Sequence, residues 1–163
     1  MAHRELATRR LRLRPVGPGD AQSLRGLVAA PQADGIEQWI AEQQAGWAAG
    51  THYTFAVHTC EGAFVGVVQL KRSPSAPRAE LGFATLPALQ GQGYATEACR
   101  AAVQFAFADL NLARISALCL GTNQASARVL EKLGFVLEAR IEQDGPDGEP
   151  AGQLLFYGLT RAQ

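Results

Sequence analysis

The chain has 163 residues, of which 47% are hydrophobic, and its 15 basic residues balance its 15 acidic ones. This size and composition predict a single folded domain over residues 1–163 and exclude a disordered protein. A net charge of zero predicts no nucleic-acid partner, and no apolar stretch reaches the roughly 20 residues of a membrane span. The N-terminal arginines precede no apolar run, so we expect no signal peptide, no membrane partner and a cytoplasmic location.

The cysteines and histidines do not predict a metal site. Cys60, Cys99 and Cys119 are widely spaced and odd in number, which suits a reducing compartment. His58 lies two residues before Cys60, but no second pair of ligands accompanies them. A structural zinc site needs four protein ligands. We therefore expect no metal.

The first part of the chain predicts one strand followed by two helices. Arg10–Arg14 alternates polar and apolar side chains, which is the pattern of a half-buried strand. Asp20 is the predicted N-cap of a first helix that ends at Ala30. A second helix is predicted over Asp34–Ala49, and Gly50 fits its C-terminal cap.

Three strands and a glycine-rich loop form the middle of the chain. The strands are predicted at Tyr53–Thr59, Ala63–Lys71 and Arg78–Thr85. Glu61-Gly62 is the natural hairpin turn between the first two. The loop over Gln90–Ala95 follows the third strand and leads into a helix.

The remaining elements alternate between helices and strands. They are predicted as a helix over Tyr94–Leu110, a strand over Arg114–Leu120, a helix over Asn123–Leu133 and strands over Phe135–Ile141 and Gln153–Leu159. The order is therefore β-α-α-β-β-β-α-β-α-β-β. It predicts an α/β fold with a mixed sheet, antiparallel outer pairs and one strand–helix–strand unit near the middle. This order differs from that of a doubly wound dinucleotide fold.

The loop over Gln90–Ala95 and the helix after it predict a phosphate site. Gly91 and Gly93 let the backbone approach a ligand closely, and the first helical turn offers unpaired N–H groups and the positive end of the helix dipole. A Walker loop would need lysine and then serine or threonine where Tyr94-Ala95 stand. A dinucleotide-binding loop would need glycine or alanine where Thr96 stands, and it would begin directly after the strand. Neither motif fits.

A third phosphate motif fits residue by residue. Gln90-x-x-Gly93-x-Ala95 resembles the coenzyme A pyrophosphate loop of the GCN5-related N-acetyltransferase (GNAT) superfamily. Three further blocks are similar, in the same order, to the ribosomal-protein N-acetyltransferase (Rim) branch: Thr8-x-x-Leu11-x-Leu13-Arg14-Pro15, Ala79-Glu80-Leu81-Gly82-Phe83 and Asn123-x-x-Ser126-x-x-Val129-Leu130-Glu131-Lys132-Leu133-Gly134-Phe135. The branch often has Tyr-Trp where this chain has Phe83-Ala84, and the smaller Ala84 indicates a roomier acyl or acceptor pocket.

The resemblance implies a GNAT fold around a central twisted, mostly antiparallel sheet, with acetyl-CoA (coenzyme A) as co-substrate. The residues that it implies for coenzyme A are Phe83, Ala84, Thr85, Gln90, Gly91, Gln92, Gly93, Tyr94, Ala95, Thr96, Asn123 and Ser126. It implies direct transfer in a ternary complex to a primary amine, either a protein N-terminus or a small amine. Dimers are common in the family, so a homodimer is one expected state.

Acyl transfer to an amine needs a base, a donor for the carbonyl oxygen and an acid for the leaving sulfur. Glu80 is the predicted base, and an ordinary ion-pair partner is its alternative role. The resemblance implies a main-chain N–H near Phe83–Thr85 as the oxygen's donor, because the family's strands splay apart there. It also implies Ser126 as the acid, with Tyr157 as the rival, although Asn123-x-x-Ser126 is equally typical of a helix N-cap.

Two further alternatives concern the acceptor and the activity. Trp39 and Trp47 lie at a helical spacing that is typical of core, but the first two helices border the acceptor in this family, so Trp39 is a candidate wall of the amine pocket. An acyl-CoA-binding sensor or scaffold without efficient transfer is the alternative to an enzyme. The presence of Glu80 and Ser126 favours the enzyme, because a pure binder needs only the loop.

Overall fold

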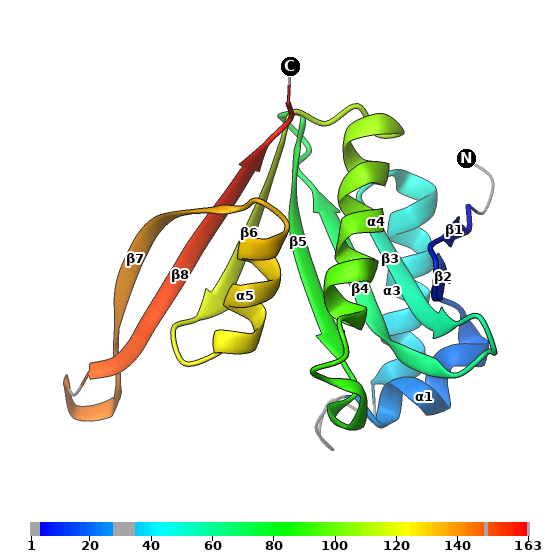
Figure 1. The fold of residues 1–163 in the computed structure, drawn as a ribbon, viewed down its shortest axis with the longest axis horizontal. Helices are drawn as coiled ribbons and strands as arrows, with labels where there is room; N and C mark the ends of the chain where they lie inside the picture. The colour runs from blue at the N-terminus through cyan, green and yellow to red at the C-terminus, as the bar shows by residue number, and fades with distance from the viewer. Residues whose placement is uncertain (1–3, 28–34, 149, 163) are drawn as a thin grey trace.

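Eight strands form one sheet in the order β1-β2-β3-β4-β5-β6-β8-β7 in a computed structural model, which describes residues 4–27, 35–148 and 150–162 (Figure 1). Their bounds are Leu6–Ala7 for β1, Leu11–Pro15 for β2, His52–Thr59 for β3, Phe64–Arg72 for β4, Arg78–Thr85 for β5, Arg114–Leu120 for β6, Val136–Asp144 for β7 and Pro150–Thr160 for β8. Neighbouring strands run antiparallel except β5 and β6, which are parallel. The predicted mixed, mostly antiparallel sheet is confirmed.

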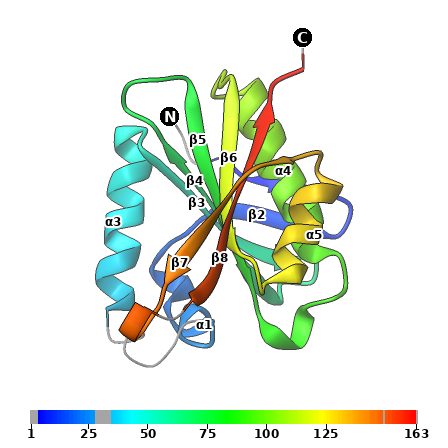
Figure 2. The same cartoon turned by 90° about the vertical axis from the view of Figure 1, so that its left-hand side faces the viewer.

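The helices cover both faces of this sheet. Their bounds are Ala21–Arg25 for α1, Ile36–Ala49 for α3, Tyr94–Ala108 for α4 and Gln124–Lys132 for α5. Figure 2 shows α3 on one face and α4 and α5 on the other. Gly50 caps α3 in the left-handed conformation (φ 74°), as predicted. The predicted end of the first helix at Ala30 and the predicted start of the second at Asp34 lie outside the described residues.

Asp20 occupies the N-cap position of α1, as predicted, but its side chain makes no capping hydrogen bond to that helix. Its carboxylate accepts hydrogen bonds from the Gly17 N–H (2.9 Å) and from the Arg14 guanidinium (2.9 Å). Because Pro18–Asp20 form a short 3-10 turn, the Asp20 carboxylate lies next to the backbone N–H of Gly17, the residue just before that turn. The side chain therefore stabilises the segment before the helix and pairs with a charge on β2.

Two strand features differ from the prediction. The two-residue strand β1 was not expected, because a strand this short has no alternation to detect. The β7–β8 hairpin is longer than predicted, since β7 runs to Asp144 and β8 begins at Pro150. Nearly all of β7 is exposed, so burial does not impose an apolar pattern on its outer residues.

Aromatic side chains form the centre of the core beneath α4. Trp47 is buried and packs edge-on against Phe55 (5.1 Å between ring centroids) and parallel to Phe105 of α4 (6.2 Å). Trp39 is half-buried and packs against a separate cluster that includes Ile36 and Ile40. Trp47 therefore belongs to the main core, whereas Trp39 lies on the α3 side of the sheet.

β5 and β6 diverge, and this divergence positions the site. Their parallel pairing ends at Leu81 opposite Ala117, although both strands continue. From Gly82 to Thr85, β5 pairs only with β4 on its other side. Figure 1 shows the two strands close together at one end of the sheet and apart at the other, near the start of α4. Backbone groups at the end of β5 that point away from β4 therefore have no strand partner.

Candidate active site

A cleft of about 640 Å³ opens at the end of β5, between the start of α4 and one side of α5. Every residue that the sequence predicts for coenzyme A lines this cleft except Gln92. The strand end, the glycine loop and α5 therefore meet at one site, although they are separate in the sequence. Glu80, Tyr157 and Trp39 do not line it.

The glycine loop adopts a conformation that favours glycine at two positions. Gly91 and Gly93 have φ values of 80° and 81°, where a side chain would be strained. The first α-helical hydrogen bond of α4 is from the Glu97 N–H to the Gly93 carbonyl. Among the described residues, the backbone N–H groups from Gly91 to Thr96 have no hydrogen-bond acceptor within reach. These donors and the helix dipole suit an anion.

Glu97 in the first turn of α4 is tied to the start of β2. Its Oε1 pairs with the Arg10 Nε (2.7 Å), and its Oε2 accepts hydrogen bonds from the Arg10 N–H (2.9 Å) and the Thr8 hydroxyl. Burial would raise the pKa of Glu97, but the hydrogen bonds from Thr8 and Arg10 and the charge of Arg10 together hold it below its usual value. The carboxylate is therefore ionised and turned toward β2.

The α5 wall of the cleft begins at a helix cap. The Asn123 side-chain oxygen accepts a hydrogen bond from the Ser126 N–H (3.1 Å), which confirms the predicted N-cap. Ser126 is half-buried and lines the cleft. Arg128 and Lys132 also line it, one turn apart on the same helix, so this wall carries two positive charges. Such charges favour an anionic ligand.

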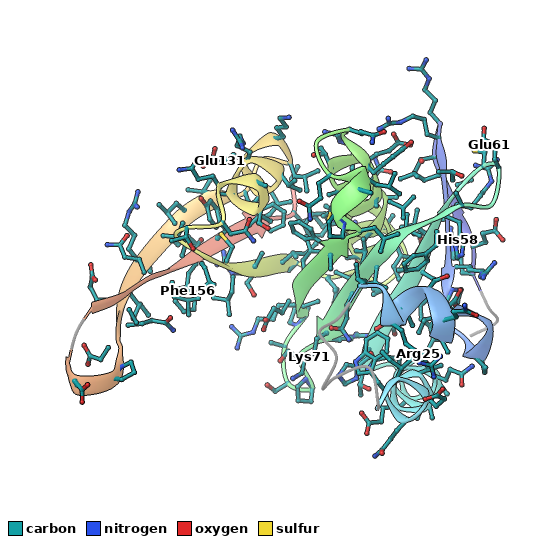
Figure 3. The ribbon with its side chains drawn as sticks, turned by 90° about the horizontal axis from the view of Figure 1, so that it is seen from below. Arg25, His58, Glu61, Lys71, Glu131 and Phe156 are labelled. Carbon is teal, nitrogen blue, oxygen red and sulfur yellow. The ribbon has the colours of Figure 1, made fainter. Side chains whose placement is uncertain are left out.

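Glu80 lies on the opposite face of the sheet from α4. Its neighbours Ala79 and Leu81 are buried in the core with α4, so the alternation of β5 places Glu80 and Ala84 together on the α3 face. Glu80 is exposed, and across the sheet it is in register with Lys71 on β4 and with a serine on β6. Figure 3 shows Lys71 on the α3 side of the sheet. The described residues include no hydrogen-bond or ion-pair partner for Glu80.

Tyr157 is buried within the sheet and points toward α5, outside the cleft. Its hydroxyl donates to the Glu131 carboxylate at 3.3 Å, and Figure 3 shows Glu131 on α5. Burial, together with the negative charge of Glu131, raises the pKa of Tyr157. The structure therefore brings Ser126 to the cleft lining and leaves Tyr157 behind it.

Several cleft residues were missed from the sequence. They are Leu27, Pro87, Leu89, Ala125, Arg128 and Val129. Ala125, Arg128 and Val129 share one face of α5 with Lys132, a helical spacing that could have indicated a common surface. Leu27 could not have been found in this way, because it follows α1 and reaches the cleft only through the tertiary fold.

The described residues offer no sign of a metal site or a membrane span. They contain no group of three or more histidine, cysteine, aspartate or glutamate side chains that could hold a metal ion. Within the same residues, the helices are too short or too polar to cross a bilayer.

Comparison with known families gives a match over most of the chain. The sequence profile of the acetyltransferase (GNAT) domain matches residues 10–136. The N-acetyltransferase YnaD of Bacillus subtilis is 34% identical over 84 residues, which are 52% of this chain and 49% of YnaD. The spermidine N(1)-acetyltransferase of Escherichia coli K12 is 31% identical over 83 residues, 50% of this chain and 45% of that enzyme. The chain thus spans about half the length of these curated relatives.

Solved structures share the whole fold at low sequence identity. The chain is similar to RimL, a ribosomal L7/L12 alpha-N-protein acetyltransferase solved with coenzyme A, with a TM-score of 0.82 and 18% identity over 96% of this chain and 98% of that one. It is also similar to the ribosomal-protein-S5-alanine acetyltransferase of Vibrio fischeri, with a TM-score of 0.80 and 18% identity over 96% of both chains.

Proposed function

The chain belongs to the acetyltransferase (GNAT) family of N-acetyltransferases, and we propose that it moves an acetyl group from acetyl-CoA directly to a primary amine in a ternary complex. The observation that carries this proposal is the cleft at the diverging strands, where the glycine loop, the end of β5 and the start of α5 meet. We also propose that residues 1–163 act as one domain.

The residues of the cleft fit the chemistry of coenzyme A. The free N–H groups from Gly91 to Thr96 would hold the pyrophosphate, and Arg128 and Lys132 add positive charge. The unpaired edge of β5 over Phe83–Thr85 would hold the pantetheine arm by backbone hydrogen bonds, with Asn123 on the opposite wall. When bound, acetyl-CoA supplies the activated acetyl thioester.

Three groups of the chain then serve the transfer. Glu80 lies outside the cleft on the α3 face of the sheet, the side where we propose Trp39 as a wall of the amine pocket, and from there it takes a proton from the amine, directly or through one water, so that the amine is neutral when it attacks. A backbone N–H near Phe83–Thr85 donates to the carbonyl oxygen as that oxygen gains negative charge. The Ser126 hydroxyl gives a proton to the departing sulfur. Tyr157 is the weaker candidate for this last role, because its hydroxyl donates to Glu131 outside the cleft.

The acceptor is a primary amine, either a protein N-terminus or a small amine. Relatives support both classes, since RimL modifies a protein N-terminus and the Escherichia coli enzyme modifies spermidine. Trp39 and Glu80 lie on the same side of the sheet, which supports Trp39 as a wall of the amine pocket. We also propose that the protein is cytoplasmic, that it forms a homodimer and that it needs no metal.

Release of free thiol from acetyl-CoA with a panel of amines tests this function. We expect release that depends on the amine, and in Glu80→Gln a fall in kcat of about 100-fold with folding unchanged. Glu61→Gln is the matched control, because Glu61 is an exposed glutamate at the turn between β3 and β4 (Figure 3). Coenzyme A binding without turnover on any amine would instead support a sensor or scaffold and contradict the enzyme.

A further inference from the structure

Arg10 lies outside the cleft but contacts several groups at the junction of the glycine loop and α4. Its Nε is 2.7 Å from the Glu97 carboxylate, and its Nη1 donates to the Gln92 carbonyl at 3.0 Å. Its guanidinium lies 4.5 Å from the centre of the Tyr94 ring. A Cβ on Gly93 would be 3.3 Å from Arg10 Nη2, so the guanidinium sits directly behind that glycine.

The bond to Gln92 sets the direction of the next N–H group. A trans peptide is planar, so its C=O and N–H point in opposite directions. The Gln92 carbonyl points at Arg10, and neither residue lines the cleft, whereas Gly93 does. The Gly93 N–H therefore points away from Arg10 and toward the cleft, where a phosphate oxygen can accept from it.

Arg10 also neutralises a charge that would oppose phosphate binding. Glu97 directly follows Thr96, which lines the cleft, and an unpaired carboxylate this close to a phosphate would repel it. Arg10 and Thr8 together engage both oxygens of Glu97 and turn the carboxylate toward β2.

We infer that Arg10 is a positioning residue for the coenzyme A loop, which aims the Gly93 N–H into the cleft and screens the phosphate from Glu97. This inference rests on the proposed function of the cleft. Arginine suits the role better than lysine, because its planar fork bonds Glu97 and Gln92 at once and lies over the Tyr94 ring.

Binding of free coenzyme A, measured by calorimetry, tests the inference without any acceptor or turnover. We expect Arg10→Gln to raise the Kd of coenzyme A about tenfold, as the loss of charge-assisted hydrogen bonds implies. With acetyl-CoA as the varied substrate, KM rises by a similar factor and kcat stays within about twofold. Arg10→Lys should lie between Arg10→Gln and the wild type.

Arg4→Gln is the matched control. Arg4 pairs with Asp109 at 2.8 Å, so it too ties the N-terminal segment to α4, but at the opposite end of the helix from the loop. The two arginine side chains are similarly exposed, at 49% for Arg4 and 41% for Arg10. Arg4→Gln should leave the Kd of coenzyme A unchanged, which separates loop positioning from general attachment of the N-terminal segment.

A double variant separates the two parts of the role. If Arg10 screens the phosphate from Glu97, the double variant that carries both Arg10→Gln and Glu97→Gln should bind coenzyme A more tightly than the single variant Arg10→Gln.

A Kd of Arg10→Gln equal to that of the wild type, or a fall in kcat with KM unchanged, would overturn the inference. If Arg10→Gln does not fold, Arg10→Lys against Arg4→Gln gives the same comparison. Failure of the wild type to bind coenzyme A would overturn the proposed function as well, whereas binding without turnover would overturn only the transferase.

Discussion

At the scale of single residues, Ser126 and Tyr157 differ in where their hydroxyls lie. Ser126 lines the cleft at the start of α5, whereas the Tyr157 hydroxyl donates to Glu131 and its pKa is raised by burial and by that carboxylate. A proton donor must reach the atom that it protonates. We therefore predict that Ser126→Ala lowers kcat by about 100-fold or more, while Tyr157→Phe leaves kcat close to that of the wild type.

Steady-state thiol release with saturating acetyl-CoA measures both variants. Coenzyme A binding provides the control, because Ser126→Ala retains the Asn123 cap, which uses the Ser126 backbone N–H. The reverse order of effects, with Tyr157→Phe the more damaging, would assign the proton to Tyr157 and refute the assignment to Ser126.

The sequence predicts most of the residues that line the cleft, but it does not predict the Arg10–Glu97 pair that lies behind the glycine loop. Gly91 and Gly93 are recognisable because their positive φ values favour glycine, and the loop motif sits between a strand and a helix. Arg10 and Glu97 are 87 positions apart, and each has an ordinary explanation alone, as a strand arginine and a helix-dipole partner. Their pairing appears only when β2 and α4 are packed together.

At the scale of elements, the shape of the strand end depends on Gly66 of β4. A Cβ on Gly66 would overlap the carbonyl oxygen of Ala84, so the two strands approach each other more closely than a side chain allows. Ala84 and Thr85 both line the cleft. We predict that Gly66→Ala lowers the free energy of unfolding by about 1–3 kcal/mol, as overpacking does, and that it weakens coenzyme A binding by moving the end of β5.

Chemical unfolding and coenzyme A titration test this prediction together. Gly82→Ala is the control for stability. Gly82 lies on β5 in the same β4–β5 pair, but a Cβ on Gly82 would have no atom within 4 Å. It should change the free energy of unfolding by less than about 0.5 kcal/mol. If Gly66→Ala and Gly82→Ala had the same free energy of unfolding, the close approach of β4 and β5 at Gly66 would not affect stability, and the prediction would be contradicted.

The divergence of β5 from β6 could not be derived from the side chains of either strand. Both strands have ordinary alternation through the point where pairing ends, at Leu81 and Ala117. Backbone groups that lack a partner leave no mark in the residue types. The resemblance to a family was therefore the only route to this feature from the sequence.

At the scale of the whole molecule, the element order and the mixed sheet followed from periodicity and turns. Strands with one buried face, such as β2 and β5, and capped helices, such as α5, carry strong local patterns. The structure differs from the prediction where the local pattern is weak: the two-residue β1 was not expected, the exposed β7–β8 hairpin extends beyond its predicted ends, and the Asp20 carboxylate accepts from the Gly17 N–H instead of capping α1. The acceptor follows from neither periodicity nor the fold.

The central claim is that the glycine loop and the free edge of β5 hold acetyl-CoA. A crystal structure of the protein with coenzyme A tests it most directly. We predict that the pyrophosphate accepts hydrogen bonds from N–H groups between Gly91 and Thr96, with the pantetheine arm along Phe83–Thr85 and its sulfur near Ser126. Coenzyme A bound elsewhere, or a pyrophosphate beyond hydrogen-bonding distance of those N–H groups, would contradict the claim.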